Sequence, residues 1–138
     1  MAEQAGGQDD AGKLVLRLVL GILILLHGIA KLSGGFAFVA GVTAKAGLPG
    51  AFAYAVYLGE IVGPVLVILG LWTRLGALII VVNMLVAVGL VHTSQLVGLN
   101  QQGGYGLELQ AMYLFGALAV ALLGAGRFSL GGIDGRWN

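Results

Sequence analysis

The stretch KLVLRLVLGILILLHGIAKL, residues 13–32, decides the fold of this chain because it is long and apolar enough to cross a lipid bilayer. About 20 residues at about 1.5 Å each match a hydrocarbon core of roughly 30 Å. The apolar run is continuous and lacks the alternation of a half-buried strand, so a helix is expected. Three further stretches share this length and character: GAFAYAVYLGEIVGPVLVILGLW (50–72), RLGALIIVVNMLVAVGLVH (74–92) and GLELQAMYLFGALAVALLGA (106–125). The sequence therefore predicts an all-α membrane protein, a bundle of four transmembrane helices.

Composition supports the bilayer as the main solvent of this protein. Of its 138 residues, 59% are hydrophobic and 9% are charged, whereas soluble domains carry about a quarter charged residues. A net charge of +1 provides no basic surface for nucleic acid. Cysteine is absent, which excludes disulfides, thiolate metal sites and iron–sulfur clusters. Any redox role must therefore use a bound cofactor or substrate.

The segments between the predicted spans differ in character. Spans two and three are separated only by Thr73, which predicts a tight antiparallel hairpin. Residues 33–49 are apolar enough for a short helix in the membrane interface, whereas residues 93–105 are polar and Gly-bearing, as expected of a mobile loop. We therefore divide the chain into a disordered N-terminal tail (1–12), a transmembrane domain (13–130) and a C-terminal tail (131–138).

The placement of basic residues predicts the orientation of the bundle. Lys31 and Lys45 fall at one membrane face, and the other five basic residues fall at the opposite face. Lys and Arg are enriched in cytoplasmic segments, so both termini are expected to be cytoplasmic, in a multi-pass protein of a prokaryotic cytoplasmic membrane. The five residues are Lys13, Arg17, Arg74, Arg127 and Arg136.

The first span carries four polar side chains on one face of its helix. At about 100° per residue, Lys13, Arg17, His27 and Lys31 occupy an arc of roughly 80°. The two lysines lie at opposite ends, where long side chains reach the membrane surface. Arg17 and His27 lie deeper, where ionisable groups almost always face the interior of a bundle. We expect these two to form an inward-facing stripe.

The second span carries a carboxylate near its middle. Glu60 at this depth costs several kcal/mol unless it is paired or protonated. Pro64 has no N–H, so the carbonyl of Glu60 loses its helical partner and a kink is expected. These features favour a pocket wall. The alternative is an ion pair of Glu60 with Arg17 or His27 that only joins helices.

Two further ionisable residues lie at the non-cytoplasmic ends of spans three and four. His92 ends span three and Glu108 begins span four. Together with His27 and Lys31, they are expected to converge on one site, with Glu60 beneath.

Three chemistries can use this set of residues. Two histidines and two carboxylates can ligate a metal, and His27 with His92 can ligate a haem, but no spacing such as HxxxH or ExxH supports either cofactor. A quinone headgroup needs only hydrogen-bond donors and proton-handling groups, which His and Glu supply. A quinone headgroup is therefore the third possible ligand, and it requires no spacing motif.

Six short motifs, in this order and spacing, resemble the DoxX family of small four-helix membrane proteins. The resemblance covers residues 14–130 and places Arg17, His27, Gly28, Lys31, Glu60, Arg74, His92 and Glu108 on the polar positions that recur in the family. The chain departs from the family pattern at Pro64, where a small residue is usual, and in a longer connection before Tyr105. The motifs are LRLVLGILILLHGIAKL (16–32), GLP (47–49), GEIVGPVLVILGLWTRLGAL (59–78), NMLVAVGLVH (83–92), GYGLELQ (104–110) and GAGRFSL (124–130).

The resemblance implies a membrane location and an association with redox systems, in some relatives with a thiosulfate:quinone oxidoreductase. We therefore expect a membrane subunit of a quinone-linked oxidoreductase. Glu60 and His27 are the expected catalytic residues, handling protons or holding the headgroup, and Arg17 is the expected charge partner of Glu60. The residues expected to bind the cofactor are Arg17, Lys31, His92 and Glu108.

Two other functions fit the same features. A non-catalytic subunit that scaffolds or anchors a larger membrane complex, or a homo-oligomer, fits the small size and the absence of cysteine. A small transporter fits the intramembrane carboxylate, although the two halves of the chain show no inverted repeat.

Overall fold

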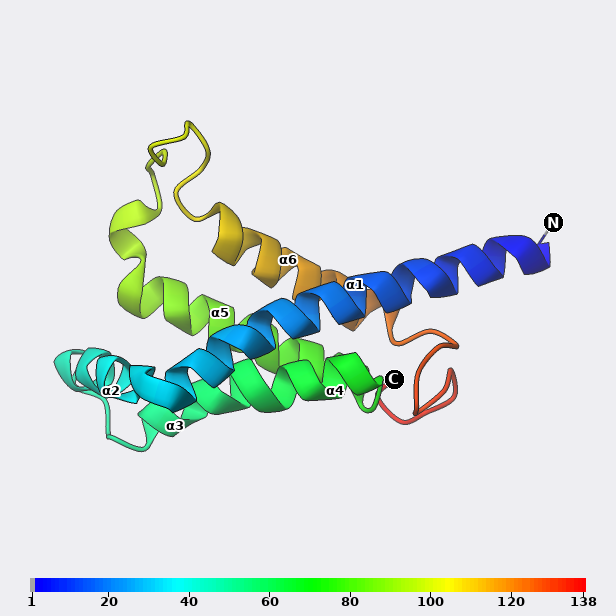
Figure 1. Cartoon of the computed structure of the whole chain (residues 1–138), viewed down its shortest axis with the longest axis horizontal. Coiled ribbons are helices and arrows are strands. Elements are labelled where there is room, and N and C mark those ends of the chain that lie inside the picture. Colours follow the sequence, from blue (N-terminus) through cyan, green and yellow to red (C-terminus); the bar gives the residue numbers. More distant parts are fainter. Residues whose placement is uncertain (1) are drawn as a thin grey trace.

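The computed structural model describes residues 2–138, and helices dominate it (Figure 1). Four rods form the bundle: α1, the broken rod α3–η2–α4, α5 and α6. The predicted four-helix bundle is therefore confirmed. The helical elements, where η1 and η2 are π-helical and η3 is a 3₁₀ turn, are α1 (Ala2–Ala30), η1 (Lys31–Gly35), α2 (Phe36–Lys45), α3 (Phe52–Tyr57), η2 (Leu58–Val62), α4 (Gly63–Leu69), α5 (Thr73–Val91), η3 (Thr93–Gln95) and α6 (Glu108–Leu123).

The bundle has the surface of a multi-pass membrane protein. Among the described residues, three helical segments are long and apolar enough to cross a membrane, and α6 is a shorter apolar helix of 16 residues. Large apolar side chains point outward, with exposed fractions of 60% at Val15, 62% at Phe115 and 70% at Leu122. Such a surface is stable in lipid and not in water. The inner core contains Leu20, Ile24, Val67, Ala77, Ile80, Met84, Tyr113, Ala117 and Val120.

The N-terminal segment differs from the expected disordered tail. Helix α1 begins at Ala2, well before Lys13. Asp10 is buried, and its carboxylate accepts hydrogen bonds from Arg127 Nε at 2.8 Å and from the Arg127 backbone N–H at 3.1 Å. This contact with a residue far along the chain fixes the start of α1 against the bundle. The N-terminal segment is therefore a continuation of the first helix.

The hairpin between α4 and α5 lies at the same end of the bundle as both chain termini, which we call the terminal end (Figure 1). Its turn uses left-handed backbone at Gly70 (φ 71°) and Trp72 (φ 45°). Asn138 fastens it, because Asn138 Oδ1 accepts hydrogen bonds from the Thr73 backbone N–H at 3.2 Å and from Thr73 Oγ1 at 2.8 Å. The expected tight hairpin is present.

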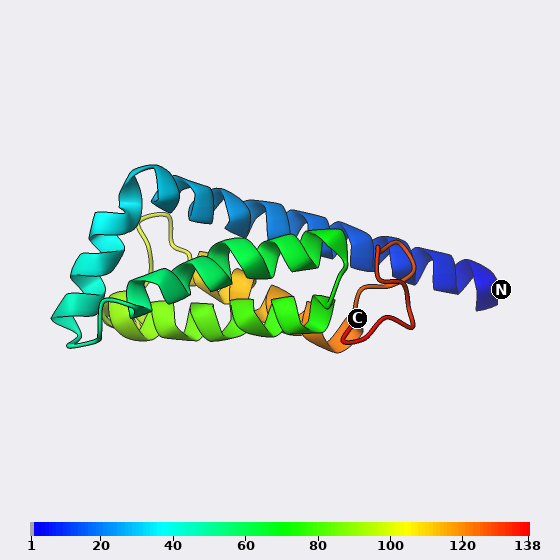
Figure 2. The ribbon, with the colours of Figure 1, turned by 90° about the horizontal axis from the view of Figure 1, so that it is seen from below.

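The opposite end, which we call the loop end, carries the expected short helix. The chain kinks at Gly34, whose backbone is not helical, and α2 turns sharply away from α1 to cross the end of the bundle (Figure 2). The connection between α5 and α6 lies at this end as well, with an isolated antiparallel bridge between Leu99 and Tyr105.

The second rod is broken where the sequence predicts a kink. Around Glu60 the chain forms the π-helical turn η2, and the Gly63 N–H bonds to the carbonyl of Leu58, five residues back. Pro64 contributes to this break because it supplies no N–H to the preceding turn. Helix α1 packs tightly on the turn at Gly28, where a Cβ atom would meet the carbonyl group of Glu60. Single π turns inside α-helices occur frequently at functional sites.

Candidate functional site

A small cavity between α1, η2, α5 and α6, nearer the loop end, gathers most of the predicted polar residues. Its volume is about 110 Å³. Apolar side chains including Ile24 and Met84 close its walls. Four of the six predicted site residues line it. The free-energy cost of burying ionisable side chains in a membrane therefore predicted these four residues from the sequence. The polar lining residues are His27, Lys31, Glu60, His92, Gln110 and Tyr113.

Two of the lining residues, Lys31 and Glu60, form an ion pair. Lys31 Nζ lies 2.5 Å from Glu60 Oε1, and the exposed fractions of the two side chains are 29% and 5%. Glu60 Oε2 is buried and has no hydrogen-bond partner among the described residues. An unpaired buried acceptor costs about 1–3 kcal/mol. One carboxylate oxygen therefore holds the lysine, and the other is free to accept a proton or a hydrogen bond.

His27 lies at the outer edge of the cavity and is itself exposed. Its Nδ1 lies 2.9 Å from the carbonyl oxygen of Leu23, one turn earlier on α1. A carbonyl only accepts, so Nδ1 carries a proton, and in the neutral ring Nε2 is left as an acceptor. The ring also meets the ring of Tyr113 edge-on, with centroids 5.8 Å apart and planes at 81°.

His92 approaches the cavity from the end of α5. Its Nε2 lies 3.4 Å from Gln110 Nε2, and its Nδ1 lies 3.2 Å from Gln95 Oε1. An amide nitrogen only donates, so the contact with Gln110 makes Nε2 the acceptor, and Nδ1 then donates to Gln95. In a neutral ring, this pattern places the proton on Nδ1.

Arg17 does not pair with Glu60, in contrast to the prediction. Its guanidinium donates to the carbonyl oxygens of Val67 at 3.1 Å and Phe128 at 2.5 Å, near the terminal end. Arg17 and Lys31 share a helix face, but 14 residues of rise separate them by about 21 Å. Lys31 lies at the depth of Glu60 and forms the ion pair instead.

Glu108 lies outside the cavity, which corrects its predicted place in the pocket wall. It is exposed, and its Oε1 accepts a hydrogen bond from Asn100 Nδ2 at 3.0 Å. Glu108 is the first residue of α6, where a side chain can turn toward the preceding loop. The same Asn100 side chain also accepts from the backbone N–H groups of Gln102 and Gly104, so Glu108 belongs to the loop structure.

The sequence reasoning missed Gln110 and Tyr113. These residues lie three positions apart and so share one face of α6, with Ala117 following on the buried side of the helix. Their spacing at helical periodicity on span four is the signal in the sequence that marks these two residues, as it marks the polar stripe on span one.

The arrangement is suited to handling protons. It combines a carboxylate that has one oxygen without a partner among the described residues, the Nε2 of His27, which can accept a proton, and the Nε2 of His92, which accepts from Gln110. A polar cavity of this size has room for several water molecules. Among the described residues, no group of three or more His, Asp or Glu side chains is placed to hold a metal ion.

Comparisons with known proteins agree with this picture. A family model described as DoxX matches residues 12–93, a range that includes His27, Lys31, Glu60 and His92. The chain is also similar to the "Putative oxidoreductase CatD" of Bacillus subtilis (strain 168), with 30% identity over 119 residues, which cover 84% of this chain and 81% of that protein. No solved structure matches the chain.

Proposed function

Because the chain belongs to the DoxX family, we propose that it is a membrane subunit of a quinone-linked redox system and that its polar cavity handles the protons of that reaction. Two-electron reduction of a quinone to a quinol takes up two protons, so a quinone-linked site inside the bilayer needs a proton path. The similarity to a protein named as an oxidoreductase supports the redox assignment. The proposal includes a prokaryotic cytoplasmic membrane, with both termini on the cytoplasmic side.

The observation that carries this proposal is the free oxygen of Glu60. A carboxylate whose only role is to join helices would be expected to satisfy both oxygens, yet Oε2 of Glu60 is buried without a partner among the described residues, and Glu60 is one of the residues that line the cavity. Lys31 fixes the orientation of the carboxylate, and His27 and His92 supply further proton acceptors. At about 110 Å³ the cavity is well below the 300–1,000 Å³ of typical ligand sites. Its size suits water and protons rather than a whole ligand.

The second candidate function, a non-catalytic scaffold of a larger complex, is favoured by the ion pair itself. Lys31 follows α1 and Glu60 lies in η2, so their contact also joins two helical rods. In that case the loss of Glu60 would reduce the amount of assembled complex, and not the rate per complex.

The test compares membranes of the host organism that carry wild-type chain, Glu60→Gln, Glu108→Gln or no chain. Glu108→Gln is the matched control, because it removes a carboxylate at the same end of the bundle but outside the cavity. Quinone reduction by the membranes is measured and divided by the amount of chain found in the complex.

We expect the rate per assembled chain to fall about a hundredfold or more in Glu60→Gln, as loss of a proton-transfer group predicts, and to stay near wild type in Glu108→Gln. An unchanged rate per chain with less assembled complex would favour the scaffold. Quinone reduction that does not depend on the chain at all would remove the redox proposal.

A further inference from the structure

The polar cavity lies close to the loop end of the bundle. Four of its six polar residues come from the parts of the helices nearest that end. His27 lies three residues before Ala30, the end of α1, and Lys31 follows directly. His92 directly follows α5, and Gln110 is the third residue of α6. At about 1.5 Å per residue, these positions lie within about 5 Å of the helix ends, so the cavity lies near the loop-end surface.

The two members of the ion pair differ in their contact with the surroundings. The Lys31 side chain is 29% exposed, whereas the Glu60 side chain is 5% exposed. Glu60 Oε2 is buried, so water does not reach it directly. Glu60 Oε1 lies 2.5 Å from Lys31 Nζ, within hydrogen-bond distance. The accessible member of the pair is therefore the lysine.

Closer to the terminal end, glycines bring the helical rods into direct contact. A Cβ atom at Gly63 of α4 would lie 3.0 Å from the carbonyl oxygen of Gly76 on α5, and a Cβ atom at Gly76 would lie 2.9 Å from the carbonyl oxygen of Gly63. A Cβ atom at Gly21 of α1 would lie 3.2 Å from the carbonyl oxygen of Pro64. Contacts this close leave no room for a water molecule between the backbones.

Apolar side chains fill the remaining space between the cavity and the terminal end. Beyond them, the Arg17 guanidinium donates to two backbone carbonyl oxygens, which fix it in place. A charge is unstable in a dry apolar layer, so this layer blocks protons from the terminal end. The filling side chains, each 0% or 1% exposed, are Val67, Ile80, Ala117 and Val120.

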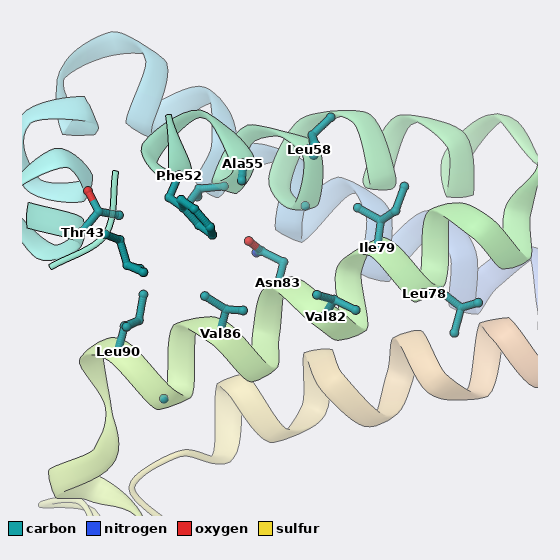
Figure 3. A pocket seen from close by; sticks show the side chains of 14 residues that line it. Thr43, Phe52, Ala55, Leu58, Leu78, Ile79, Val82, Asn83, Val86 and Leu90 are labelled. Carbon is teal, nitrogen blue, oxygen red and sulfur yellow. The ribbon is translucent and has the colours of Figure 1, made fainter. Parts of the chain in front are cut away.

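An apolar groove on the other side of η2 provides no second route for protons. Figure 3 shows Phe52 of α3 on one wall of this groove and Val86 and Leu90 of α5 on the other. The groove has a volume of about 790 Å³, yet none of its lining residues among the described part of the chain is titratable. Gly59 lines the groove whereas Glu60 lines the cavity, so η2 separates the two spaces.

We propose that protons reach Glu60 from the loop side of the membrane alone, and that Lys31 delivers them. The Lys31 ammonium gives the proton of its hydrogen bond to Glu60 Oε1, and the amine left behind takes a proton from water at the loop end. The net change is one proton added to the carboxylate. The other titratable groups that line the cavity are His27 of α1, His92 at the end of α5 and Tyr113 of α6. The use of these protons in quinone reduction rests on the proposed function, whereas the direction of access rests on the packing alone.

The first experiment measures the direction of access without any redox reaction. The chain contains no cysteine, so Ala87→Cys places a single thiol in the cavity wall. Ser94→Cys and Arg136→Cys are the controls for the loop end and the terminal end. Each variant is placed in lipid vesicles in one known orientation, with the pH set separately on the two sides, and is alkylated with iodoacetamide, which crosses the membrane. Because the thiolate is the reacting form, the alkylation rate reports the pH of the side with which the thiol exchanges protons.

We expect a rise of about one pH unit on the loop side to increase the rate for Ala87→Cys about tenfold, as the thiolate fraction does below the thiol pKa. The same rise on the terminal side should leave that rate unchanged. Ser94→Cys should follow the loop-side pH, and Arg136→Cys should follow the terminal-side pH. A rate for Ala87→Cys that follows the terminal side or both sides, or no alkylation at all, would overturn the inference.

The second experiment separates proton delivery by Lys31 from a purely structural role. Lys31→Arg keeps the positive charge and the donor for Glu60, but a guanidinium does not release its proton in proteins. Lys45→Arg is the matched control, because Lys45 is an exposed lysine at the same end of the bundle. We expect quinone reduction per assembled chain to fall about a hundredfold in Lys31→Arg and to stay near wild type in Lys45→Arg. A wild-type rate per assembled chain in Lys31→Arg would show that Lys31 only orients the carboxylate.

Further outcomes separate this inference from the proposed function. Quinone reduction that is lost in Glu60→Gln, together with a thiol in Ala87→Cys that follows the terminal-side pH, would overturn the direction of access and leave the redox proposal standing. A thiol that follows the loop-side pH, in a chain that quinone reduction does not need, would support the direction of access and remove the redox proposal.

Discussion

Replacing Gly28 by alanine tests whether the close packing of α1 on η2 holds the cavity together. A Cβ at this position would lie 2.9 Å from the carbonyl carbon of Glu60 and 2.8 Å from Cγ1 of Ile61, and closer still to the Glu60 carbonyl oxygen. Ordinary Cβ contacts begin at 3.4 Å, so the backbone of η2 must retreat by at least 3.4 − 2.9 = 0.5 Å. Because the obstacle is backbone, no rotamer change relieves it.

The expected magnitude follows from two opposing effects. Overpacking of this kind costs roughly 1–3 kcal/mol, while alanine in place of glycine inside a helix stabilises by roughly 0.5–1 kcal/mol. Gly12→Ala is the matched control, since it lies on the same helix and its Cβ would meet nothing within 4 Å. The helix effect cancels between the two variants, so Gly28→Ala should unfold about 1–3 kcal/mol more easily than Gly12→Ala.

The assay is unfolding of the purified chain in mixed micelles with increasing sodium dodecyl sulfate, followed by far-UV circular dichroism. Movement of η2 should also weaken the contact of Lys31 with Glu60, so Gly28→Ala should lower quinone reduction in the membrane assay. Equal unfolding midpoints for Gly28→Ala and Gly12→Ala would refute the packing described for α1 and η2.

Three further predictions concern the terminal end and the orientation of the bundle. Arg17→Met should lower the free energy of unfolding by about 2–4 kcal/mol, because two carbonyl oxygens lose their donor. The control Arg136→Met changes an exposed residue and should alter the free energy of unfolding by less than about 0.5 kcal/mol. Equal effects of the two substitutions would contradict the buried role of Arg17. Asp10 lies before the apolar span, and its hydrogen bonds to Arg127 hold its pKa below the ordinary 3.8. The stabilising effect of the Asp10 carboxylate is therefore present above that pH and is lost as the pH falls through the lower pKa of the folded state. The stability advantage of wild type over Asp10→Asn should shrink only in acid, and a constant advantage down to about pH 2 would count against the pairing. Because the chain contains no cysteine, single substitutions report topology: in intact cells an impermeant thiol reagent should label Ser94→Cys and spare Arg136→Cys, and the reverse pattern would invert the orientation.

The sequence predicted the architecture well because bilayer thickness constrains it strongly. A continuous apolar stretch of bilayer length has few alternatives to a transmembrane helix, and Thr73 left almost no chain for a loop between spans two and three. The break in the second rod also followed from the sequence, because proline lacks an N–H.

The partners inside the site were harder to predict, because the depth of Glu60 relative to Arg17 and Lys31 depends on how the helices pack. Arg17 and Lys31 point the same way from α1, and only the rise of the helix decides which of them meets Glu60. The pairing of Asp10 with Arg127 joins residues 117 positions apart, so the sequence of the N-terminal segment alone does not predict it.

The π turn at Leu58–Val62 accommodates one additional residue in a single membrane crossing. Its hydrogen-bonded ring encloses one more residue than an α-helical ring, so the wider turn absorbs that residue and the segments on either side keep their faces. The same residue added to a regular α-helix would rotate everything beyond it by about 100°. Chains with matching hydropathy profiles can therefore differ in whether one of their membrane crossings contains a widened turn.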